Sequence, residues 1–127
     1  MSRLLKITFI LNAILSILVG APLLFAPGRF LGIFGWSPVE PLLSRLLGAA
    51  LLAFAWLSLR NLRINDDRQA LFAVESELLF CFLGSLGFVR HLILPSWYPP
   101  MVWIVFFILA GGAILWLVNL ILMCKKN

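Results

Sequence analysis

The sequence predicts an all-α membrane protein, a bundle of four transmembrane helices whose N and C termini are both cytoplasmic. The first observation behind this prediction is composition: of 127 residues, 63% are hydrophobic and 12% are charged. A soluble domain of this length buries only part of its chain and could not hide so much apolar surface. The other two observations are the grouping of the apolar residues into four long stretches and the gathering of basic residues on one side of the resulting topology.

Each apolar stretch is close to the ~20 residues that cross about 30 Å of hydrocarbon as a helix. Because backbone polar groups in lipid must be satisfied within the element that carries them, helices are the expected structure. We expect them at about residues 4–26, 41–60, 69–94 and 100–124, in a single domain covering residues 1–127.

The distribution of basic residues predicts how the chain is oriented. Arg29, Arg45 and Arg90 fall toward one side of a four-pass topology. The larger basic group flanks the other side: Arg3, Lys6, Arg60, Arg63, Arg68, Lys125 and Lys126. An excess of Lys and Arg marks the cytoplasmic side of inner-membrane proteins. We therefore expect a multi-pass inner-membrane protein with both termini and the loop 61–69 in the cytoplasm. The same distribution explains the net charge of +5 without nucleic acid as a partner.

The two outer connections are rich in aromatic residues. Residues 26–41 contain Phe30 and Trp36 among glycines, and residues 95–100 contain Trp97 and Tyr98. Such residues favour the headgroup level of a bilayer, so we expect the first connection to lie flat there.

Small residues indicate where helices approach one another closely. Gly48 and its alanine neighbours lie in the second predicted helix, Gly84 and Gly87 in the third, and Gly111 and Gly112 in the fourth. Helix packing in lipid depends on such residues. They indicate ordinary packing within the bundle, and a remaining small-residue face leaves a homo-oligomer or a membrane-protein partner open.

Two acidic residues, Glu75 and Glu77, interrupt the third predicted helix. They differ by roughly 200° around a helix, so they do not form a catalytic carboxylate pair. Glu77 shares a face with Cys81 and is expected to point into the bundle, whereas Glu75 is expected to form an interfacial ion pair with Arg60 or Lys6.

A stripe of polar and small residues in the first predicted helix is expected to face Glu77 inside the bundle. Thr8, Asn12, Ser16 and Gly20 recur every four residues, and this spacing places them on one face. Asn12 lies within about one turn of Glu77 in depth, and Asn119 of the last helix lies in the same half of the membrane. We expect Glu77, Asn12 and Asn119 to form a buried polar cluster, which serves either as a proton or cation site or as hydrogen-bonding glue between helices.

A second cluster is expected at the outer face. Its members are Arg45, Arg90, His91, Arg29, Trp97 and Tyr98. Surplus positive charge beside aromatic residues suits an anionic or quinone-like headgroup. The alternative is that the arginines simply extend outward to the membrane surface.

No catalytic constellation is found in the sequence. Asp66 and Asp67 are predicted to lie on the opposite side of the membrane from His91, which excludes a Ser-His-Asp arrangement. With one His and two distant Cys, Cys81 and Cys124, the chain offers neither a zinc site nor bis-His haem ligation. We therefore predict no enzymatic activity, no cofactor and no metal.

The segment SRLLGAALLAFAWLSLRNLR (44–63), preceded by APGRFLGIFGW, resembles small four-helix bacterial inner-membrane proteins of uncharacterised function. The resemblance implies the fold and the location but no activity. The first helix offers only Asn12 where small multidrug exporters carry a glutamate, and the paired cysteines of disulfide-forming or quinone-reducing bundles are missing.

Two functions follow as hypotheses. The first is a non-enzymatic binding or accessory protein that contacts membrane lipid headgroups or a membrane partner at its outer face. The alternative is a small proton- or cation-coupled transporter or channel subunit that uses Glu77.

Overall fold

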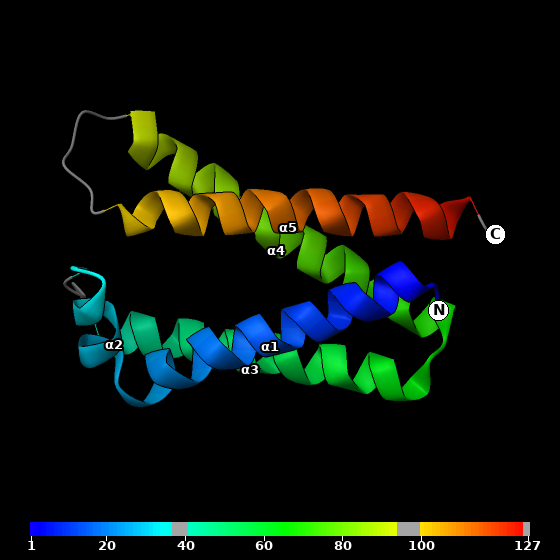
Figure 1. Ribbon diagram of the computed structural model, residues 1–127, viewed down its shortest axis with the longest axis horizontal. Helices are drawn as coiled ribbons and strands as arrows, with labels where there is room; N and C mark the ends of the chain where they lie inside the picture. The colour runs from blue at the N-terminus through cyan, green and yellow to red at the C-terminus, as the bar shows by residue number, and fades with distance from the viewer. Residues whose placement is uncertain (37–40, 94–99, 126–127) are drawn as a thin grey trace. The chain divides into compact units, whose positions relative to one another are not determined.

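The computed structural model describes residues 1–36, 41–93 and 100–125, without the side chains of residues 90–92. The regular structure of these residues is helical (Figure 1). The helices are α1 (Arg3–Phe25), α2 (Pro27–Ile33), α3 (Pro41–Ile64), α4 (Asp67–Ile93) and α5 (Met101–Cys124). The predicted all-α class is therefore confirmed.

Four of these helices, α1, α3, α4 and α5, are long and apolar enough to cross a membrane. The surfaces of these helices are strongly apolar. Only 11% of the most apolar part of α5 is buried, and Phe107 is 65% exposed. Side chains of this kind are stable only against hydrocarbon, because a soluble protein of this size does not leave such large apolar patches in water. The chain is a multi-pass membrane protein.

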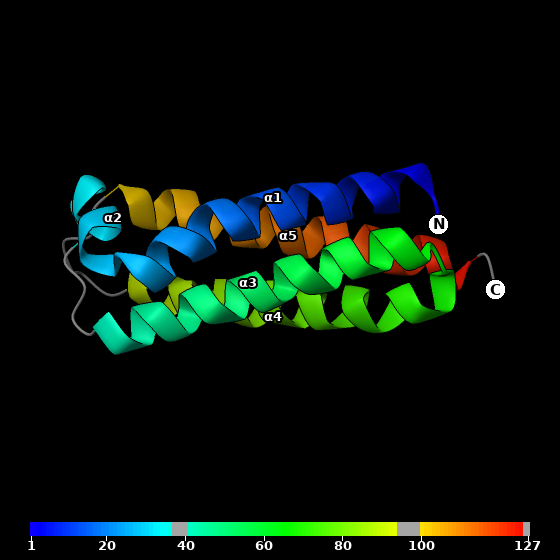
Figure 2. The ribbon, with the colours of Figure 1, turned by 90° about the horizontal axis from the view of Figure 1, so that it is seen from below.

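The chain divides into two compact units, residues Met1–Asn65 and Asp66–Asn127. In the first unit α1 and α3 run side by side as a hairpin, with α2 in the connection between them (Figures 1 and 2). In the second unit α4 packs against α5 as another hairpin. The joining of the two hairpins into one four-helix bundle stays a prediction.

Two glycines set the closest approach between α1 and α3. A methyl group placed on Gly48 would lie 2.6 Å from the backbone nitrogen of Leu24 and 2.7 Å from the carbonyl oxygen of Gly20. One placed on Gly20 would lie 3.0 Å from the carbonyl oxygen of Gly48. The two backbones therefore meet directly, the close packing for which membrane helices use small residues.

In the second unit the closest approach is between a glycine on one helix and a side chain on the other. A methyl group on Gly84 would lie 3.2 Å from Leu109, and one on Gly112 would lie 3.2 Å from the Sγ atom of Cys81. The expectation that small residues mark helix contacts is thus confirmed at Gly48, Gly84 and Gly112. It is wrong for Gly87 and Gly111, where an added methyl group would have no atom within 4 Å.

The connection between α3 and α4 is much shorter than the predicted loop 61–69, because α3 continues to Ile64 and α4 begins at Asp67. Asn65 ends α3 in the left-handed region, with φ 56°, a conformation that asparagine tolerates. The Asp66 carboxylate accepts a hydrogen bond from the Arg68 backbone N–H at 3.1 Å and so caps the start of α4. Local capping thus extends both helices past their apolar segments.

The connection between α1 and α3 contains a helix where the sequence suggested only a flat loop. The seven-residue helix α2 begins at Pro27, whose fixed φ suits a first helical position. A turn follows at Gly35, whose φ of +70° requires glycine-like freedom. Residues 37–40 lie outside the described part of the chain.

Candidate functional site

The polar stripe of α1 lies on a buried face of the helix. Thr8 is 2% exposed and Ser16 is 5% exposed, and Gly20 forms the crossing with α3. The Thr8 hydroxyl donates to the carbonyl oxygen of Leu4 at 2.9 Å, which satisfies the hydroxyl inside its own helix. The spacing of these residues brings them to one face because three to four residues complete each helical turn.

Asn12, the most polar member of the stripe, donates from Nδ2 to the hydroxyl oxygen of Ser58 at 2.9 Å. This bond joins α1 to α3 two to three turns away from the glycine crossing, toward the start of α1. Ser58 is 0% exposed, so the bond lies inside the hairpin. Hydrogen bonds of this kind between membrane helices contribute about 0.6 kcal/mol on average.

Two polar residues of α3, Ser58 and Asn61, were not among the predicted site residues. Both are buried, and the Asn61 Nδ2 donates to the carbonyl oxygen of Leu57 at 2.8 Å. The sequence contained a signal for these two residues, because their spacing places Ser58 and Asn61 on the same helix face as Gly48 and Ala55. The prediction that residues 61–69 form a loop removed Asn61 from the helix on which that face could be recognised.

The second unit contains the buried acid. Glu77 is 2% exposed and lies one turn before Cys81 on the same face of α4. Because Cys81 meets Gly112 and Gly84 meets Leu109 in an antiparallel pair, one turn further places Glu77 at the level of Trp116. Trp116 is itself 2% exposed. Glu77 therefore lies within a packed part of the structure and not on a lipid-facing surface.

Asn119 lies on the same face of α5, about one turn beyond Trp116. It is 1% exposed, and its Nδ2 donates to the carbonyl oxygen of Leu115 at 2.9 Å. The register of the α4–α5 hairpin thus puts Glu77 and Asn119 on facing helix faces about one turn apart. Asn12 belongs to the other unit, so its membership of one cluster with Glu77 and Asn119 stays a prediction.

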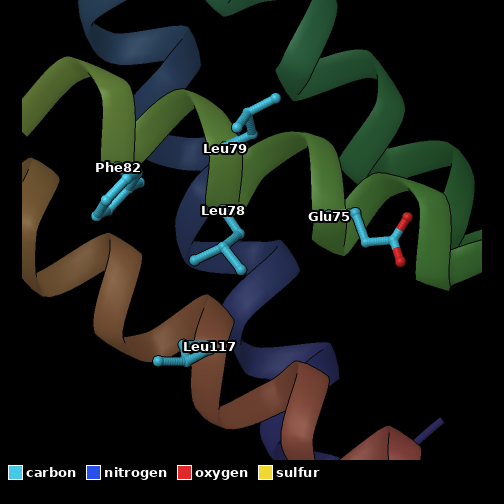
Figure 3. Close-up of a pocket in the computed structure, with 5 residues that line it drawn as sticks. All are labelled: Glu75, Leu78, Leu79, Phe82 and Leu117. Atoms are coloured by element: carbon cyan, nitrogen blue, oxygen red, sulfur yellow. The ribbon is translucent and has the colours of Figure 1, made fainter.

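Glu75 occupies a different environment from Glu77, as the rotation between them requires. It is exposed, and it lines a groove between α4 and α5 (Figure 3). Among the described side chains of its own unit, those of residues 66–89, 93 and 100–125, no basic group forms an ion pair with it. Its expected pairing with Arg60 or Lys6, which belong to the first unit, stays a prediction.

The outer group is only partly described. Arg29 lies in α2 and Arg45 lies about one turn from the start of α3, and both are exposed. In Figure 2, α2 and the start of α3 lie at the same end of the first hairpin. Arg90 and His91 lie near the end of α4, but their side chains are outside the described ones. Trp97 and Tyr98 fall in residues 94–99, which are also outside the described part of the chain.

Comparison of the chain with protein-family models, with curated proteins and with solved structures gives no match. The class of this protein therefore rests on its own fold: a small α-helical membrane protein with four candidate spans. Within that fold, polar groups are buried at two places, along α1 and α3 and along α4 and α5. The resemblance to small bacterial inner-membrane proteins stays a prediction.

Proposed function

We propose that this chain is a small, non-enzymatic binding or accessory protein of the inner membrane that contacts anionic lipid headgroups at the α2 end of its first hairpin. The observation that carries the proposal is the pairing there of exposed positive charge with exposed apolar surface. Arg29 and Arg45 are exposed, while Phe25 and Ile33 are each 78% exposed. A segment of this kind lies at the boundary between acyl chains and headgroups, with its apolar side chains inward.

The position of the arginines fits a phosphate-binding role. Arg29 lies within α2, and Arg45 lies about 6 Å along the helix axis from the first residue of α3, so both reach the membrane surface from one end of the hairpin. Long basic side chains extend to that surface while their apolar stems stay in lipid. Each basic residue near an anionic surface contributes about 1 kcal/mol to the attraction.

The double substitution Arg29→Gln with Arg45→Gln is expected to weaken this contact by about 2 kcal/mol, or roughly thirtyfold in affinity. The measurement uses a fluorophore on Gly32→Cys, because Gly32 is exposed and has no atom within 4 Å of an added Cβ. Cys124→Ser removes the exposed native thiol, and Cys81 is buried. Phosphatidylglycerol that carries a quencher on its headgroup should quench the fluorophore of the otherwise wild-type chain more than phosphatidylcholine labelled in the same way.

The matched control is Arg60→Gln with Arg63→Gln, two exposed arginines at the other end of α3. This variant carries the same change in charge but should leave quenching at position 32 unaltered. Equal loss in the two variants would show a general effect of net charge, and the proposed contact would be wrong.

The orientation of the chain is part of the proposal. The starts of α1 and α4 and the ends of α3 and α5 carry or adjoin the larger group of basic residues, which supports a cytoplasmic location for both termini. A reporter that works only in the cytoplasm is expected to be active when it is fused to either end of the chain. Activity of a periplasmic reporter at either terminus would contradict this orientation.

The burial of Glu77 favours a second candidate function, a proton- or cation-coupled transporter or channel subunit. A carboxylate within a membrane span is costly unless it is paired or protonated, and intramembrane acids commonly mark ion pathways. Glu77 is 2% exposed and lies one turn from the contact between Cys81 and Gly112. The distinguishing property is a pH-dependent flux through reconstituted vesicles that requires Glu77.

A further inference from the structure

The groove between α4 and α5 differs from both sites described above. It has a volume of about 350 Å³ and is lined by Glu75, Leu78, Leu79, Phe82 and Leu117 (Figure 3). Four of the lining residues lie on one face of α4, and Leu117 closes the groove from α5. Leu79 is 57% exposed and Phe82 is 51% exposed, so the apolar wall is open to an occupant.

The aliphatic stem of Glu75 lines one end of this apolar groove, and its carboxylate lies beyond that end. In Figure 3 the side chain extends away from Phe82, toward the start of α4. This direction agrees with the tilt of helical side chains toward the N-terminus. Glu75 lies two turns into α4, about 12 Å along its axis, and a charge at that depth is costly without a cation beside it. Within the described residues of its own unit no basic side chain pairs with it.

We propose that this groove binds a small amphiphilic amine, with the ammonium group at Glu75 and the apolar body along Leu79, Phe82 and Leu117. The charge complements the exposed carboxylate, and the lining of leucines and phenylalanine suits a hydrocarbon or aromatic body. The volume falls at the lower end of the range for small-molecule sites, about 300–1,000 Å³. The site is independent of the headgroup contact at α2 and of Glu77.

Two other occupants fit the groove less well. A partner helix needs a long contact face, whereas Glu75 to Phe82 spans only about 10 Å of α4. A phospholipid with an amine headgroup carries its phosphate between the amine and the acyl chains. Bringing that amine down to Glu75 would place the phosphate beside the carboxylate, where the two negative charges repel. A single-headed amine avoids both difficulties.

The test uses the full chain in nanodiscs of phosphatidylcholine, which contains no primary amine. A long-chain alkylamine with a terminal bromine is the probe, the matching alcohol is the neutral comparison, and quenching of tryptophan fluorescence reports binding. On the wild-type chain the amine is expected to reach half-saturation at a concentration about tenfold lower than the alcohol, which corresponds to about 1.4 kcal/mol. Glu75→Gln should remove this difference, and Glu75→Asp should retain most of it.

The matched control is Ser76→Ala, at the same depth of α4 but outside the groove lining. The hydrogen bond described for the Ser76 side chain lies within its own helix: the hydroxyl donates to the carbonyl oxygen of Phe72 at 2.8 Å. This variant should bind the amine as the wild type does.

Several results would overturn the proposal. Equal binding of amine and alcohol by the wild type would do so, even if no variant folds. A preference for the amine that survives Glu75→Gln would place the ligand elsewhere. Loss of the preference when phosphatidylethanolamine is added to the nanodiscs would identify a lipid as the occupant. A preference for the amine that appears only in Arg60→Gln would show that Arg60 pairs with Glu75 in the wild type. A change of oligomeric state in Glu75→Gln would identify a second copy of the chain as the occupant of the groove.

Discussion

Replacing Gly48 with alanine is expected to lower the free energy of unfolding by about 1–3 kcal/mol, the usual cost of overpacking. The added methyl group would lie 2.6 Å from the Leu24 nitrogen and 2.7 Å from the Gly20 oxygen. Both atoms belong to the backbone of α1 and cannot rotate away, so the two helices must separate. Leucine at the same position should disrupt the α1–α3 hairpin. Unfolding in mixed detergent micelles, followed by circular dichroism, measures the loss.

Two other glycines provide graded controls. An added methyl group on Gly112 would lie 3.2 Å from the Cys81 sulfur, which belongs to a side chain and can shift slightly. Gly112→Ala should therefore cost less than Gly48→Ala. Gly111 is exposed and has no atom within 4 Å of an added Cβ, so Gly111→Ala should leave the stability unchanged or raise it by up to about 1 kcal/mol. Equal losses at the three positions would contradict the assigned crossing points.

The fold could be predicted because its main determinant is local in the sequence. The four spans follow from the length and apolar character of each segment, and the predicted starts and ends fall close to those observed for α1 and α5. The prediction was weakest where polar residues continue a helix beyond the hydrocarbon. Asn61 and Arg63 lie in α3, not in a loop, because the helix ends only at the left-handed Asn65.

Individual contacts in the site were harder to predict, because they depend on the register between helices. The spacing of Thr8, Asn12 and Ser16 predicted a polar face, and this face is present in α1. The partner of Asn12 within its hairpin, Ser58, follows only once the Gly20–Gly48 crossing sets which residues of α1 and α3 lie level. Sequence periodicity gives the face of one helix, whereas the glycine contacts give the alignment of two.

Replacing Glu77 with glutamine is expected to preserve the fold and to separate the two functions proposed for this chain. Glutamine has nearly the same shape and keeps an oxygen acceptor, so the packing around this 2% exposed side chain should survive with a stability change within about 1 kcal/mol. A glutamine cannot take up or release a proton in this way. A transporter that depends on Glu77 should therefore lose its pH-dependent flux completely, while headgroup binding at α2 should be unchanged.

The matched control is the same chemical change at Glu75, two residues away and on a different face of α4. Because Glu75 is exposed and Glu77 is buried, Glu75→Gln should leave any proton-coupled flux intact. Flux is measured with a pH-sensitive dye inside reconstituted vesicles, and circular dichroism checks that each variant is folded. Flux that persists in Glu77→Gln would rule out the transport function. If the wild type shows no flux and Glu77→Gln lowers only the unfolding temperature, the buried carboxylate serves to hold its neighbouring helices together.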